Sequence, residues 1–127
     1  MRLNGVAKTL TREEALRLHR EMWADMQKEL GDCPSAKDRK RYKGKWVREH
    51  GYADVLSNCF LCEYAVNKPR DNYGVYCCTL CPIDWSPLCA EGFDFCTSMY
   101  RFECRNGYSV YTNATISEIL ALPERRR

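Results

Sequence analysis

Five of the nine cysteines in this 127-residue chain lie between positions 59 and 81. Four of them form two pairs, Cys59-x-x-Cys62 and Cys78-x-x-Cys81, with fifteen residues between the pairs. A two-residue gap lets one turn point two thiolates at a shared point, and two such turns supply the four soft ligands of a tetrahedral Zn²⁺ site at about 2.3 Å. The spacing therefore predicts Zn²⁺ as a cofactor, and the alternative is that reduced thiols pack as small apolar groups.

The other cysteines have no pairing of their own. Cys77 adjoins Cys78, but only Cys78 has the two-residue gap to Cys81. Two or three of the remaining cysteines could join Cys77 in a second metal site, although buried free thiols are the simpler interpretation. These remaining cysteines are Cys33, Cys89, Cys96 and Cys104.

The amino-terminal stretch MRLNGVAKTL has no apolar run before the charged TREEALRLHR, so we expect no secretory signal. No segment approaches the ~18 apolar residues of a membrane span. We therefore expect a cytoplasmic protein, in a compartment that keeps thiols reduced. An odd number of cysteines in that compartment favours metal ligation over a disulfide framework.

The segment before the cysteines predicts two helices. Thr11 and Glu14 form a capping box, and apolar side chains then recur every three or four residues up to Leu30, which predicts a helix over 12–30. Its apolar stripe is Ala15, Leu18, Met22, Met26 and Leu30, with Trp23 beside it. His19 falls on this stripe, where a core histidine is the expected role. A second helix is expected from about Ser35 to Gly51.

This second helix is strongly basic, with a net charge of +5 between positions 35 and 50 in a chain whose total is +3. Such a helix with Tyr42 and Trp46 on one side could bind nucleic-acid phosphates. The alternative is a solvated outer face with the two aromatic residues turned into the core. The candidate nucleic-acid-binding residues are Lys37, Arg39, Lys40, Arg41, Lys43, Lys45 and Arg48.

The carboxyl-terminal half predicts a β-hairpin and a short helix. Residues 73–80 alternate like a strand, and Asn106-Gly107 is a hairpin turn dipeptide between 99–104 and 108–112. Thr115 and Glu118 form a second capping box before a helix over 116–122. We expect one α+β domain over 1–127, with a helical part at 10–51, a zinc-binding segment at 58–90 and a β-hairpin plus short helix at 91–123.

Several motifs together resemble the small cysteine-rich proteins of unassigned function that phages and prophages of Gram-positive bacteria carry. The resemblance rests on TREEALRLHREMW, NCFLCEYA, CxxCPIDW and the terminal helix ending in LP. It implies that the paired cysteines bind the metal and that the protein is a phage accessory protein. The aromatic β segment and the extra cysteines depart from the pattern, so Cys89 stays open as an alternative ligand.

No catalytic constellation is recognisable, and four thiolates would close the shell of a zinc ion, so we expect a binding protein and not an enzyme. Two hypotheses remain. In the first, an aromatic surface docks on a host-defence or replication protein; its candidate residues are Tyr100, Phe102, Tyr108 and Tyr111. In the second, the basic helix binds nucleic acid. A total charge of only +3 favours the first.

Overall fold

The computed structural model describes residues 1–66, 81–84 and 114–125. These residues combine helices with a small antiparallel sheet, in agreement with the expected α+β class. The predicted strand at 73–80 and the predicted hairpin at 99–112 lie outside the described residues. The elements are β1 (Arg2–Leu3), β2 (Val6–Ala7), α1 (Arg12–Leu30), α2 (Ala36–Glu49), β3 (Tyr52–Ala53), the 3₁₀ turn η1 (Leu56–Asn58), α3 (Phe60–Val66) and α6 (Ile116–Leu120).

Helix α1 begins and ends where the sequence predicts. The Glu14 amide donates to Thr11 Oγ1 at 3.1 Å, and the Thr11 amide donates to Glu14 Oε1 at 3.0 Å, which completes the capping box. Gly31 ends the helix at a φ of 85°. The predicted apolar stripe was wrong at its last position because Leu30 is 40% exposed. His19 is buried, as predicted.

The buried face of helix α2 contains both basic and apolar side chains. The Ser35 hydroxyl caps the helix by accepting from the Asp38 amide at 3.1 Å. The buried side chains recur at the three- and four-residue spacing of one helix face, and they are Arg39, Tyr42, Lys43, Trp46 and Val47. Trp46 is held there because its Nε1 donates to Asp25 Oδ2 of α1 at 2.8 Å. The interpretation of Tyr42 and Trp46 as core anchors is therefore confirmed.

The sheet was not predicted, and it lies far from the hairpin expected near the carboxyl terminus. Its strand order is β2-β1-β3, with both pairs antiparallel. Asn4 and Gly5 both have positive φ in the turn between β1 and β2, as tight hairpins of this type require. Gly51 precedes β3 at a φ of 82°, and a Cβ at this position would collide with the Asn4 side chain. Each strand has two residues, too few for an alternating pattern to be visible.

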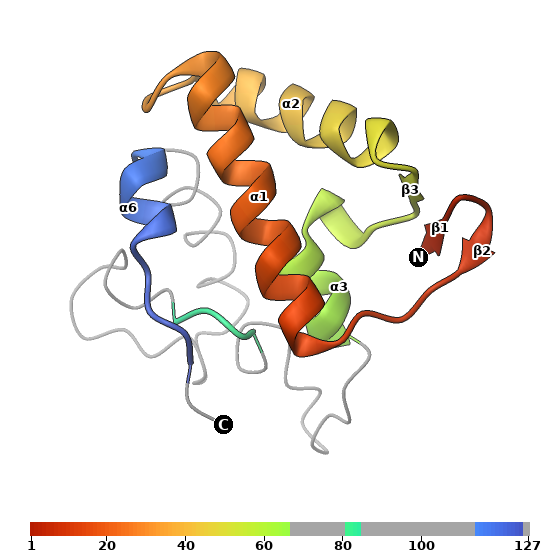
Figure 1. Cartoon of the computed structure of the whole chain (residues 1–127). Helices are drawn as coiled ribbons and strands as arrows, with labels where there is room; N and C mark the ends of the chain where they lie inside the picture. Colours follow the sequence, from red (N-terminus) through yellow and green to blue (C-terminus); the bar gives the residue numbers. More distant parts are fainter. Residues whose placement is uncertain (67–80, 85–113, 126–127) are drawn as a thin grey trace, which may run out of the picture.

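Helix α1 is the centre of the described part of the molecule. It packs against α3, α6 and α2, and Figure 1 shows α2 crossing one end of α1 while α3 and α6 lie on either side of it. The largest fully buried side chains come from α1, α3, α6 and the 81–84 segment, and they include Trp23, Phe60, Ile83 and Ile116. None of the described helices is both long enough and apolar enough to cross a membrane.

The short helix α6 begins as predicted and ends two residues earlier. Thr115 and Glu118 form its capping box. The loop after α1 also contacts the amino-terminal end of α6, because Asp32 Oδ1 accepts from the amide and the hydroxyl of Ser117, both at 2.8 Å. The Ile116 amide also donates to the Asp32 carbonyl at 2.9 Å. These contacts fix the last helix against the carboxyl-terminal end of α1.

Candidate metal centre

The first cysteine pair lies where η1 meets α3: Cys59 stands between the two elements, and Cys62 is in the first turn of α3. The Cys59 amide donates to the Leu56 carbonyl at 2.9 Å, and the Glu63 amide donates to the Cys59 carbonyl at 2.9 Å, so Cys59 joins the two helical turns. The Cys62 amide donates to Cys59 Sγ at 3.4 Å. The structure therefore brings both sulfur atoms of Cys59-x-x-Cys62 to one turn, as the spacing predicts.

The surroundings of Cys59 favour its thiolate form. A hydrogen bond with the Cys62 side chain lowers the pKa of Cys59 to about 6, together with the charge of Lys43 and the amides of Cys62 and Leu61, while burial opposes the shift. The thiolate is the form that binds a metal ion. Two thiols on one turn, one of them easily ionised, suit a soft divalent ion such as Zn²⁺.

Glu63 fixes the position of this turn. Its carboxylate is buried on α3, where Oε1 accepts from the Leu56 amide at 2.9 Å. The other oxygen, Oε2, lies 3.4 Å from the amino group of Met1. A single carboxylate thus connects α3 with η1 and with the residue before β1. A buried charge that is paired and hydrogen-bonded in this way holds its partners in one geometry.

Cys81, from the second predicted pair, lies near the start of α1. It is buried, and its carbonyl accepts from Arg125 Nε at 3.1 Å. Residues 81–84 run antiparallel to 123–125, because the Arg125 amide donates to the Pro82 carbonyl at 2.7 Å and the Asp84 amide to the Pro123 carbonyl at 2.9 Å. The cysteine is therefore fixed by a short backbone pairing with the carboxyl-terminal segment.

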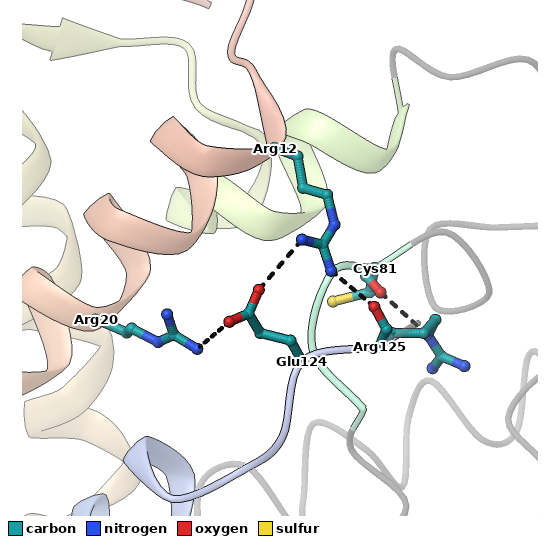
Figure 2. A network of polar contacts seen from close by, with 5 residues as sticks. All are labelled: Arg12, Arg20, Cys81, Glu124 and Arg125. Atoms are coloured by element: carbon teal, nitrogen blue, oxygen red, sulfur yellow. Dashed lines mark hydrogen bonds and ion pairs between the residues drawn. The ribbon is translucent and has the colours of Figure 1, made fainter. Parts of the chain in front are cut away.

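Two arginines of α1 hold this carboxyl-terminal segment. Figure 2 shows Glu124 between Arg12 and Arg20, with Oε1 at 3.2 Å from Arg12 Nη1 and Oε2 at 3.4 Å from Arg20 Nη2. Arg12 Nη2 also donates to the Arg125 carbonyl at 2.7 Å. Both described parts of the predicted zinc-binding segment therefore pack on α1, one through α3 and one through this arginine network.

Within residues 1–66, 81–84 and 114–125, no three side chains of His, Cys, Asp or Glu form a group that could hold a metal ion. The structure thus brings Cys59 and Cys62 together without adding Cys81 as a third ligand. The fourth predicted ligand, Cys78, lies outside the described residues, as do Cys77, Cys89, Cys96 and Cys104. Cys33 is described and exposed. The four-cysteine zinc site stays a prediction.

The predicted nucleic-acid-binding residues divide into two groups. Arg39 and Lys43 are buried, with exposed fractions of 2% and 7%, and Arg39 Nε donates to the Pro34 carbonyl at 3.0 Å. These two side chains are therefore not available on the surface of α2. The exposed members are Lys37, Lys40, Arg41, Lys45 and Arg48. The aromatic residues predicted to bind a partner, Tyr100, Phe102, Tyr108 and Tyr111, lie outside the described residues.

Sequence reasoning did not identify Lys43 and Glu63 as part of this site. Lys43 shares the helical spacing of Tyr42, Trp46 and Val47, so the periodicity alone places it on the buried face. The expectation that charged residues face solvent concealed this signal. Glu63 had no comparable signal, because its role depends on contacts with Leu56 and Met1 that only the folded chain creates.

Comparisons with known proteins give no match. No family model, no curated protein and no solved structure is similar to this chain at a significant level.

Proposed function

We propose that this chain is a non-enzymatic accessory binding protein, stabilised by a structural zinc ion at Cys59, Cys62, Cys78 and Cys81, that binds a host macromolecule to inhibit or redirect it. The turn that brings Cys59 and Cys62 together, with the Cys62 amide donating to Cys59 Sγ at 3.4 Å, is the observation that carries the zinc part of this proposal. The sequence resemblance supplies the phage context and, with it, the cytoplasm of the host cell.

Four thiolates fill the coordination shell of Zn²⁺ and leave no position for a substrate or a reactive water molecule. A zinc ion of this kind contributes folding free energy, which stabilises a domain of this modest length. The protein would then act by binding a partner through its surface. We propose that this partner is a host-defence or replication protein.

The test of the zinc proposal is the metal content of protein purified under reducing conditions. We expect one zinc ion per chain, and a melting temperature that falls when a strong chelator removes it. Cys33→Ser is the matched control for Cys62→Ser, because Cys33 is exposed and outside the predicted ligand set. Protein without zinc, and a melting curve that the chelator does not change, would contradict the proposal.

A second candidate function, nucleic-acid binding, is favoured by the exposed basic side chains of α2. Lys37, Lys40, Arg41 and Arg48 lie on one outward face of the helix, at spacings of three, one and seven residues. Neighbouring carboxylates reduce the charge of this face, since Asp38 lies 3.8 Å from Arg41 and Glu29 lies 3.4 Å from Lys45. The face therefore suits a weak, salt-sensitive interaction with phosphates.

One triple variant separates the two candidates. In Lys40→Gln/Arg41→Gln/Lys45→Gln, nucleic-acid binding should fall and its salt dependence should flatten, whereas capture of a host protein should persist. The matched control is Arg2→Gln/Arg17→Gln/Lys28→Gln, which removes the same charge from exposed positions outside α2. Affinity capture from host lysate, with and without nuclease, identifies which class of partner remains. If both triple variants bind nucleic acid equally well, α2 is excluded as the nucleic-acid-binding surface.

A further inference from the structure

Gly44 lies in the interior of α2, where glycine destabilises a helix relative to alanine. Its φ is not positive, whereas every other described glycine has a positive φ, so the backbone of α2 does not require glycine here. A Cβ would also fit. Its nearest neighbours would be Arg48 Nη1 at 3.4 Å and Asn58 Nδ2 at 3.7 Å, which are ordinary contact distances. The packing of the described residues therefore does not account for this glycine.

Basic side chains surround Gly44 on the outward face of α2. Arg41 and Lys40 lie three and four residues before it, and Arg48 lies four residues after it. Side chains at these spacings are neighbours on a helix surface. The three basic residues are exposed, and Gly44 itself is partly exposed. The glycine is therefore a position without a side chain, at which a bound molecule can reach the helix backbone between cations.

Two hydrogen-bond donors border this position. The Arg48 guanidinium and the Asn58 carboxamide lie next to the place that a Cβ of Gly44 would occupy. Asn58 belongs to η1, which contacts α2 beneath its carboxyl-terminal half (Figure 1). Within residues 1–66, 81–84 and 114–125, Arg48 forms no ion pair, whereas Arg41 lies 3.8 Å from Asp38. A guanidinium and an amide donor at one point suit an anionic oxygen.

The length of the basic face favours a ligand with repeated negative charges. A helix rises about 1.5 Å per residue, so the row from Lys37 to Arg48 is about 16 Å long. One strand of duplex DNA carries a phosphate about every 3.4 Å along the axis, so this row spans about five phosphates. A membrane surface is a poorer match, because a helix that binds lipid exposes its apolar side chains, and those of α2 are buried.

We propose that a backbone phosphate of a nucleic acid binds at Gly44, between Arg48 and Asn58, where the missing Cβ lets it approach the backbone of α2. This inference rests on the second candidate function, nucleic-acid binding, and names its contact point. Arg48 supplies the charge, Asn58 donates through Nδ2, and Lys40 and Arg41 contact the neighbouring phosphates. Gly44 lowers the stability of α2 and permits this close approach.

The test compares Gly44→Ala with the wild type by fluorescence anisotropy, using a short labelled DNA as a single strand and as a duplex. Gly44→Ala keeps every charge and fills the space with one methyl group. We expect it to bind DNA about 3- to 10-fold more weakly, the effect of losing one hydrogen bond. Its melting temperature should equal or exceed that of the wild type, because alanine favours the helix. A purely structural role of Gly44 would not separate these two results.

Two further variants complete the test. Arg48→Gln should weaken DNA binding and lower the slope of log affinity against log salt concentration by about one. The matched control is Ala24→Gly, the reverse exchange at an exposed position of α1. This control should lower the melting temperature and leave DNA binding unchanged, which shows that DNA affinity does not follow helix stability.

The possible failures of the inference and of the second candidate function are distinguishable. If Arg48→Gln weakens DNA binding and Gly44→Ala does not, α2 contacts nucleic acid but no phosphate lies at Gly44, and the inference is overturned. Unchanged binding by Arg48→Gln also overturns it, as does a Gly44→Ala variant that melts below the wild type, since packing would then explain the glycine. Wild-type protein that binds neither DNA probe overturns the second candidate function itself, and binding to phosphatidylserine vesicles instead would assign the basic face to a membrane.

Discussion

His19 should make the protein less stable at mildly acidic pH. Its imidazole is buried on α1, and burial, with the charges of Lys43 and Arg20, lowers its pKa from 6.5 to about 3. Above pH 6.5 the folded and unfolded states both hold a neutral imidazole. As the pH falls from 6.5 towards 3, only the unfolded chain takes up the proton, so stability is lost across this window.

The size of the effect follows from the two pKa values. Each pH unit between them is worth about 1.4 kcal/mol, so the His19 contribution should fall by about 2 kcal/mol between pH 7.5 and pH 5. The change to make is His19→Leu, which removes the titrating group and keeps an apolar side chain in the core. The free energy of unfolding of this variant should therefore depend less steeply on pH than that of the wild type.

The assay is urea unfolding of both proteins at pH 7.5, 6.5, 5.5 and 5.0, followed by far-ultraviolet circular dichroism in reducing buffer. Protonation of carboxylates and of cysteine thiols occurs in both proteins and cancels in the difference between them. That difference should change by about 2 kcal/mol in favour of His19→Leu as the pH falls to 5. If the two proteins lose stability in parallel, His19 binds its proton equally well in both states, and the account of its burial is wrong.

Three further changes test the cysteines and the start of α1. Cys62→Ser should release zinc and unfold at least the central third of the chain, because zinc binding worth ~10–16 kcal/mol is coupled to folding at such sites; a variant with full helicity and one bound zinc would contradict this. Cys33→Ser should change the free energy of unfolding by less than about 0.5 kcal/mol, since Cys33 is exposed, and loss of metal on this change would show that the ligands are misassigned. Thr11→Ala should cost about 1 kcal/mol in thermal or urea unfolding by removing the cap from α1, and an unchanged midpoint would show that the cap adds nothing to stability.

The helices were predictable because their signals are local. The capping boxes at Thr11 and Thr115 marked two helix starts, and Ser35 marked a third, within one residue of the observed positions. Caps and periodicity depend on neighbours three or four residues away, which a single sequence contains.

The remaining features depend on contacts between distant residues. Strands of two residues have no period, so the sheet that joins Leu3 to Tyr52 left no pattern. The burial of Arg39 and Lys43 reverses the usual preference of their side chains, and only their place on the Tyr42 face indicated it. In the candidate site, the two-residue gap predicted the proximity of Cys59 and Cys62, whereas nothing in the spacing indicated that Glu63 would contact Leu56 and Met1.

The pairing of residues 81–84 with 123–125 has a kinetic consequence. The hydrogen bond from Arg125 to Cys81 spans 44 positions of the chain, whereas the helices form from contacts a few positions apart. Bringing residues so far apart in the chain together lowers the conformational entropy of the chain before any stabilising contact between them forms. We therefore expect this pairing to form after α1 and α2. In a refolding experiment started by dilution from urea, we expect the helical signal to rise first and protection of the Cys81 thiol from alkylation to follow.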